Sequence, residues 1–160
     1  MGWYEAPKHV IQSLRTCYIS NSGSGQCFYA SHVVSEALKA GFIDQHVQKL
    51  RLAHKDRMDA VISIVEEKLS KFGVSISHPN GGYFLWLKMP ENIKSAAVLE
   101  VAKSTENITF IKGELASVKG DFDNYIRLSI AYYELNDIKQ AAEGLCRAIQ
   151  SVLQSQAAQL

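Results

Sequence analysis

The sequence has few of the features that mark specialised classes of protein. Its 160 residues include only three cysteines, Cys17, Cys27 and Cys146. An odd number of cysteines without close pairing indicates free thiols in a reducing compartment and not a disulfide framework. No apolar run approaches the roughly 20 residues that span a bilayer, and the N-terminus lacks the charged-then-apolar layout of a secretion signal. These absences predict a cytoplasmic protein without a membrane span.

The charge balance excludes further classes. Lysine and arginine total 17 against 16 aspartates and glutamates, which leaves a net charge of +1. Because nucleic-acid binding normally needs a basic excess, we expect no nucleic-acid partner. The five histidines lack metal-ligand spacing, so we also expect no metal site. With 47% hydrophobic residues, the composition is that of an ordinary globular chain with a core.

The first half of the chain shows helical spacing of apolar residues. The pattern predicts one helix over 7–19, a second over 26–41, and a long third helix over 43–72. Gly73 follows the third helix and suits its C′ position, because glycine adopts the left-handed conformation without steric cost. The polar, Ser/Gly-rich stretch 20–25 between the first two helices is predicted to be a flexible connector.

The second half of the chain alternates between strand and helix patterns. It predicts two helices, over 93–105 and over 135 to about 153, with Asn136 as the N-cap of the latter, and four strands, over 74–77, 83–88, 108–112 and 125–130. This order predicts an α+β fold, a small and mostly antiparallel sheet with one face covered by helices. Segment 83–87 is apolar at every position, which is typical of a strand buried on both faces. We therefore expect this chain alone to expose a sheet face that another part of the intact protein covers.

Arg127 stands out in the last predicted strand. Successive strand side chains point to opposite faces, so Arg127 shares its face with Tyr125 and Ser129, while the opposite face is apolar. A guanidinium fixed on a strand can donate two parallel hydrogen bonds to a carboxylate, a geometry that lysine does not reproduce. Arg127 is therefore a candidate carboxylate-binding residue. The alternative interpretation is a structural ion pair or a solvated charge on an edge strand.

Three blocks, in order, resemble the C-terminal part of class I/II, fold-type-I, pyridoxal-phosphate-dependent aminotransferases, with a lean toward the aminoadipate/kynurenine branch. The Gly-Trp opening at 2–7, the Pro-Asn-Gly-Gly-Tyr-Phe-Leu-Trp block at 79–90 and the Arg-Leu-Ser strand at 126–130 carry the resemblance. It implies that Arg127 binds the substrate carboxylate. It also implies that residues 1–25 are a remnant of the large cofactor domain with its connector, and that 26–160 form the small domain.

The resemblance also identifies positions that these 160 residues do not contain. In the family, the Schiff-base lysine and the arginine that binds the cofactor phosphate lie upstream of the Gly-Trp pair. The lysines present have the pattern of solvated charge, so we expect no catalytic residue here and no pyridoxal phosphate bound by the chain alone. In segment 112–116, only Gly113 remains of the family's Pro-Gly and Phe pattern. The loop on the substrate side therefore departs from the family's pattern.

Two functions remain open on the sequence alone. In the first, the chain is the C-terminal fragment of an aminotransferase whose intact, homodimeric form moves an amino group between an amino acid and a 2-oxo acid. The fragment by itself would be inactive, so whether this chain is an enzyme stays undecided. In the second, it is a non-enzymatic partner of another chain, or a small regulatory module that binds an anion at Arg127.

Overall fold

The computed structural model describes residues 5–17 and 28–157. Two compact units divide the chain, Met1–Leu50 and Arg51–Leu160. The Gly-Trp pair at 2–3, the connector at 20–25 and Cys27 lie outside the described residues. The domain boundary predicted after residue 25 lies there as well, and it stays a prediction.

The first unit consists of helices without a core of their own among the described residues. Helix α1 (Lys8–Arg15) begins directly after Pro7, and α3 (Phe28–Lys39) ends before Gly41, whose φ of 74° is left-handed. Neither helix contains a buried residue. Phe28 and Tyr29 leave 77% and 82% of their surface exposed.

Helix α4 (Phe42–Leu69) is the long helix that the sequence predicts. A short 3₁₀ turn, Ser70–Phe72, tightens its end, and Gly73 then adopts φ 75° and ψ 15°. The left-handed Gly73 confirms the predicted C-terminal cap, because a side chain at this φ would be strained. The buried residues of the helix all lie in its C-terminal half, at helical spacing: Met58, Val61, Val65 and Leu69.

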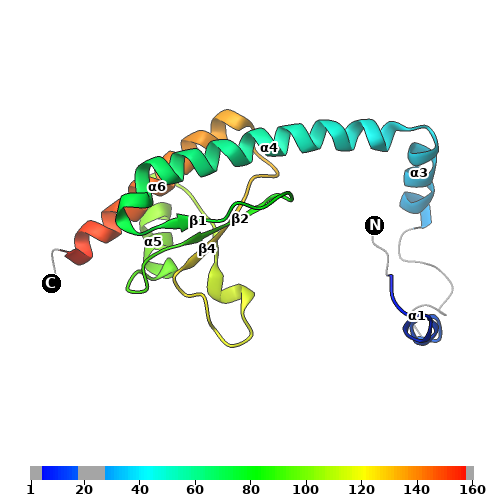
Figure 1. Cartoon of the computed structure of the whole chain (residues 1–160), viewed down its shortest axis with the longest axis horizontal. Helices are drawn as coiled ribbons and strands as arrows, with labels where there is room; N and C mark the ends of the chain where they lie inside the picture. Colours follow the sequence, from blue (N-terminus) through cyan, green and yellow to red (C-terminus); the bar gives the residue numbers. More distant parts are fainter. Residues whose placement is uncertain (1–4, 18–27, 158–160) are drawn as a thin grey trace. The chain divides into compact units, whose positions relative to one another are not determined.

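The second unit contains a four-stranded sheet (Figure 1). Its strands are β1 (Ser75–Ile76), β2 (Phe84–Lys88), β3 (Ile111–Lys112) and β4 (Tyr125–Ser129). They are all antiparallel and lie in the order β1-β2-β4-β3. The strands match the predicted positions but are shorter, and β3 begins three residues later than predicted because segment 108–110 does not pair with β4.

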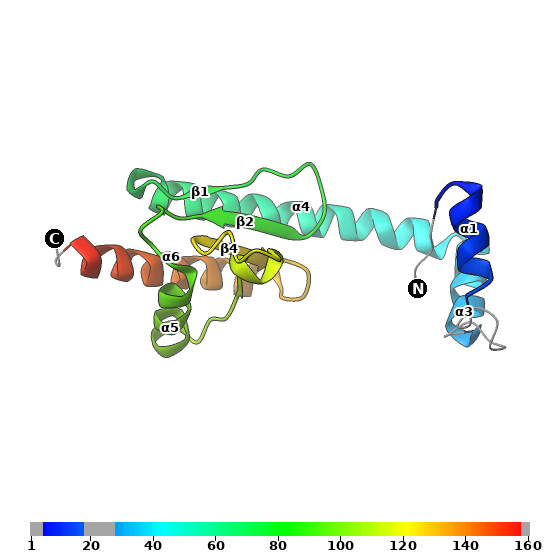
Figure 2. The same cartoon turned by 90° about the horizontal axis from the view of Figure 1, so that it is seen from below.

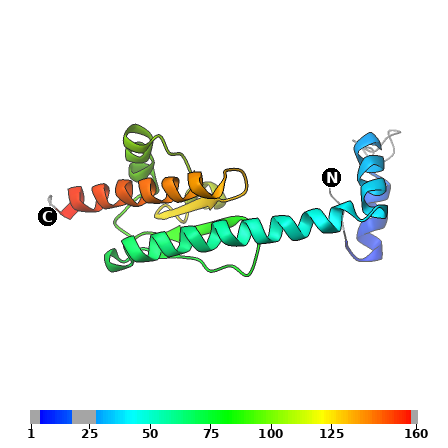
Figure 3. The same cartoon turned by 90° about the horizontal axis from the view of Figure 1, so that it is seen from above.

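Helices cover one face of this sheet and leave the other open. Seen from below, the sheet lies in front of α4 and α6 (Leu135–Ala157), and seen from above the two helices lie in front of the sheet (Figures 2 and 3). Helix α5 (Ser95–Glu106) packs against α6. The predicted α+β layer with helices on one face is confirmed. The core between these elements includes Val65, Leu69, Leu85, Leu87, Val98, Ile126, Ile130, Cys146 and Ile149.

One local prediction is wrong. Asn136 is not an N-cap, because α6 already begins at Leu135 and the amide of Ile138 donates to the carbonyl of Glu134. Strand β2 is buried on one face in this chain, since Leu85 is fully buried while Phe84 is 39% exposed. The open sheet face is the one that we expected the chain alone to expose. Among residues 5–17 and 28–157, no helix is long and apolar enough to cross a membrane.

Candidate functional site

The open face of the sheet combines aromatic rings with two cations. Alternation along β2 and β4 places six side chains on it, three from each strand: Phe84, Trp86 and Lys88, and Tyr125, Arg127 and Ser129. The register pairs Phe84 with Ser129, Trp86 with Arg127, and Lys88 with Tyr125. No carboxylate belongs to this set. An anion that approaches the face therefore meets attraction from the cations without competition from these neighbours.

Arg127 is held against an aromatic ring. It lies in the middle of β4, between Trp86 on β2 and Ile111 on β3, and it is half-buried. Its Cζ atom lies 4.6 Å from the centroid of the Phe84 ring, within the range of a cation–π contact. Its Nε atom is buried and has no hydrogen-bond partner in the described part of the chain. The guanidinium is thus fixed by packing, while its capacity to donate remains unused.

The other arginines with described partners behave differently. Arg57 donates to the carbonyl oxygens of Ile130 and Ala131, at 3.4 and 3.1 Å, and thereby ties α4 to the end of β4. Arg147 forms a two-point ion pair with Glu106, at 3.0 and 2.7 Å. Arg127 has no such carboxylate within the described ranges. Within the described ranges Arg127 thus forms no ion pair, and its role as a carboxylate-binding residue stays a prediction.

An aromatic cluster, made of Trp86, Phe122 and Tyr125, lies beside Arg127. The ring centroids of these residues are 5.2 to 6.1 Å apart. Phe122 reaches the cluster from the loop before β4 with a φ of 66°, a conformation that a bulky residue rarely adopts. Sequence reasoning missed Phe122, because neither its spacing nor its type signals a left-handed residue.

The packing around Gly113 explains why glycine stands at this position. Gly113 is the one residue that segment 112–116 shares with the family pattern. The segment forms a 3₁₀ turn, Gly113–Ala116, beside the aromatic cluster. A Cβ atom on Gly113 would lie 2.4 Å from the carbonyl oxygen of Phe122 and 2.6 Å from the Cβ of Tyr125. Only glycine fits this approach, so the turn and the cluster depend on each other.

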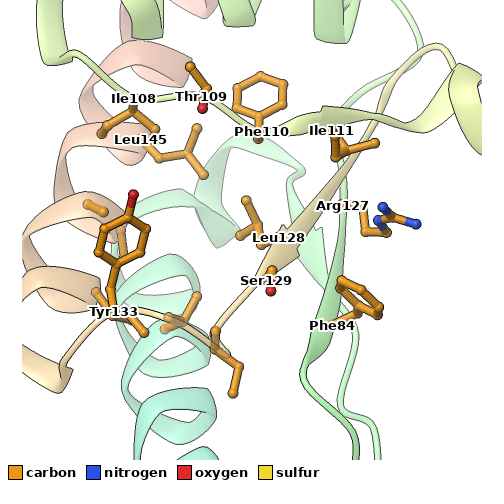
Figure 4. Close-up of a pocket in the computed structure, with 15 residues that line it drawn as sticks. Phe84, Ile108, Thr109, Phe110, Ile111, Arg127, Leu128, Ser129, Tyr133 and Leu145 are labelled. Carbon is orange, nitrogen blue, oxygen red and sulfur yellow. The ribbon is translucent and has the colours of Figure 1, made fainter. Parts of the chain in front are cut away.

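A cavity of about 350 Å³ opens beside β4, where segment 108–110 leaves the sheet (Figure 4). Its walls are mainly apolar and include Ile108, Leu128 and Leu145, while Arg127 and Phe84 also line it. Figure 4 shows the guanidinium pointing away from Leu145 and Ile108, so the charge lies at the rim and not inside the cavity.

The lysines of this chain lie at its surface. None of the twelve lysines is buried, and only Lys68 and Lys112 are even partly buried. A Schiff-base lysine needs a desolvated amine with a lowered pKa, whereas the hydrogen bond and charge of Asp59 raise the pKa of Lys55. Burial raises the pKa of the Cys146 thiol to about 11, which disfavours the nucleophilic thiolate.

Comparisons with known proteins point to one fold family. No protein-family model matches the sequence. The chain is 27% identical over 151 residues to aromatic-amino-acid aminotransferase 1 of Thermococcus litoralis, which covers 93% of the chain and 35% of that enzyme. The kynurenine aminotransferase structure from Pyrococcus horikoshii matches with a TM-score of 0.80 and 25% identity. The match covers 91% of this chain and 35% of the aminotransferase chain.

A transcriptional regulator is similar to the same extent. The HTH-type transcriptional regulator NorG of Staphylococcus aureus is 31% identical over 144 residues, which cover 88% of this chain and 31% of NorG. The chain thus spans about a third of the length of the curated relatives that it matches. In sequence and in fold, the chain is similar to the C-terminal part of the fold-type-I, pyridoxal-phosphate-dependent aminotransferases.

Proposed function

We propose that the intact protein transfers an amino group between an amino acid and a 2-oxo acid, and that Arg127 binds the α-carboxylate of the substrate. The state of Arg127 carries this proposal. It is a half-buried guanidinium, whose Cζ atom lies over the Phe84 ring at 4.6 Å from its centroid, without a carboxylate partner in the described part of the chain. The terminal N–H groups of such a guanidinium can donate two parallel hydrogen bonds to a carboxylate.

The contribution of this segment would be positioning. A carboxylate held by two parallel hydrogen bonds loses its freedom to rotate, so the bond to be broken at Cα keeps a fixed direction. The aromatic cluster of Trp86, Phe122 and Tyr125 would exclude water from one side of that carboxylate and strengthen its attraction to Arg127. Among the residues described here, none is proposed to act on the Cα atom of the substrate. The amine and the cofactor site would come from other parts of the intact, homodimeric protein.

A second candidate function rests on the similarity to NorG. The same carboxylate site would then bind a small effector inside a regulator, and no amino transfer would follow. This candidate keeps the prediction for Arg127 as a binding residue. It differs in the fate of the ligand, which would be bound and released unchanged.

The test is an amino-transfer assay of the intact protein that contains this segment. Purified protein is incubated with pyridoxal phosphate, a panel of amino acids and 2-oxoglutarate, and glutamate formation is measured. Amino transfer that Arg127→Ala abolishes supports the enzyme. Ligand binding without transfer, still lost in Arg127→Ala, supports the regulator. Transfer that Arg127→Ala leaves unchanged refutes the assignment of the carboxylate site.

The segment alone gives a second test. The 160-residue chain is mixed with pyridoxal phosphate, reduced with borohydride and digested for mass spectrometry. Because its lysines are solvent-exposed or only partly buried, we expect scattered, substoichiometric labelling of several lysines. Stoichiometric labelling of a single lysine would show that a Schiff-base site exists in this segment.

A further inference from the structure

We infer that Phe84 is a positioning residue, which sets the plane of the Arg127 guanidinium for carboxylate binding. This inference rests on the proposed function, since it assigns how the same site is prepared for its ligand. Phe84 and Arg127 lie 43 positions apart in the sequence, and the pairing of β2 with β4 brings them together.

The register leaves the face of the Phe84 ring free for Arg127. The residue directly opposite Phe84 is Ser129, whose small side chain does not cover the ring. The residue opposite Arg127 is Trp86, so Arg127 and Phe84 are diagonal neighbours on one face. Diagonal neighbours lie within reach of long and aromatic side chains, and the Cζ atom of Arg127 is 4.6 Å from the ring centroid.

Phe84 is poorly explained as a core residue. It is 39% exposed, and it is absent from the hydrophobic core that includes its neighbours Leu85 and Leu87. An aromatic ring left partly in water gains little from burial at this position. Its ring contacts the ring of Tyr83 and the guanidinium of Arg127, and neither of these residues belongs to the core.

The stack determines which donors a ligand can reach. A ring over one face of the guanidinium leaves the edges of its plane open, and carboxylates bind in that plane. The Nε atom is buried and unpartnered, whereas the two terminal nitrogens are not among the buried unpartnered atoms of the described residues. A carboxylate would therefore bind end-on, to the two terminal nitrogens of a guanidinium whose tilt Phe84 fixes.

The binding test uses the 160-residue chain and pyruvate, followed by ¹⁵N NMR, with hydroxyacetone as the ligand that lacks a carboxylate. Phe84→Leu keeps an apolar side chain but removes the ring, and we expect it to weaken pyruvate binding about 3- to 10-fold. Phe84→Tyr keeps the ring and should bind within about twofold of the wild type. Tyr132→Leu removes a ring that is 86% exposed and should change nothing.

The side-chain signal of Arg127 gives an independent readout. In the wild type, its buried Nε–H should exchange slowly with water and shift by the ring current of Phe84. Phe84→Leu should lose both properties, and Phe84→Tyr should restore them. Loss of binding together with this loss of signal supports the positioning role.

The outcomes separate the two claims. If Arg127→Lys binds pyruvate as the wild type does, or if the wild type binds hydroxyacetone equally well, the carboxylate site itself is wrong. If Arg127→Lys weakens binding and Phe84→Leu does not, only the role of Phe84 is wrong. If Phe84→Leu unfolds the chain, or Phe84→Tyr fails to rescue binding and signal, Phe84 acts through the fold and the inference is overturned.

Discussion

Replacing Arg127 with lysine should impair the intact protein without unfolding it. The substitution keeps the charge but removes the planar fork that donates two parallel hydrogen bonds. In an active intact protein we expect kcat/KM to fall by about one to three orders of magnitude, equivalent to roughly 1.4 to 4 kcal/mol of lost transition-state stabilisation.

The stability of the chain should barely change, because two effects on the free energy of unfolding oppose each other. Arg127→Lys weakens a partly exposed cation–π contact with Phe84, worth about 0.5 to 1 kcal/mol. It also removes the buried and unpartnered Nε–H, whose desolvation costs about 1 to 3 kcal/mol. Because no ion pair within the described ranges is broken, the substitution should not destabilise the chain by more than about 1 kcal/mol.

Two assays and a matched variant test this reasoning. Transamination kinetics are measured on the intact protein, and thermal unfolding on the 160-residue chain. Arg147→Lys is the control, since Arg147 pairs with Glu106 at 2.7 and 3.0 Å but does not belong to the open face. It should leave kinetics unchanged. Strong destabilisation by Arg127→Lys with normal kinetics would refute the carboxylate role and make Arg127 a structural residue.

Three further predictions follow from packing and burial. Gly113→Ala should destabilise the chain by about 1 to 3 kcal/mol in denaturant unfolding, because its Cβ would overlap the backbone of Phe122; Gly81→Ala, which meets nothing within 4 Å, is the control, and equal effects would contradict the turn geometry. In hydrogen exchange, the amides of α1 should exchange fast and those of β2 and β4 slowly, because α1 buries no residue; equal protection of α1 would show that it packs in a core. In a Cys17→Ser/Cys27→Ser background, Cys146 should react with a thiol reagent at pH 8 only after unfolding, since burial raises its pKa to about 11 and little thiolate exists; rapid reaction in the folded chain would contradict its burial.

The sequence by itself determined the elements that depend on local spacing. Helix α4 and its end at Gly73 follow from the 3.6-residue period and from the freedom of glycine at positive φ. The alternation of residue types along β4 is enough to separate Arg127 from Ile126 and Ile130, which are both buried in the fold. The resemblance carried by 79–90 and 126–130 identified the fold family, because those motifs combine turn and strand residues in a fixed order.

Only the tertiary structure decided what surrounds Arg127. The strand order β1-β2-β4-β3 brings Phe84 onto the guanidinium across 43 positions of sequence, and the same packing buries Nε without a partner. The sequence also gave no sign that Phe122 has a positive φ or that segment 108–110 does not pair with β4. Propensity and periodicity describe neighbours along the chain, whereas these features arise from contacts between segments that are distant in sequence. The sequence thus predicted a carboxylate-binding arginine, and the fold placed the ring of Phe84 against its guanidinium.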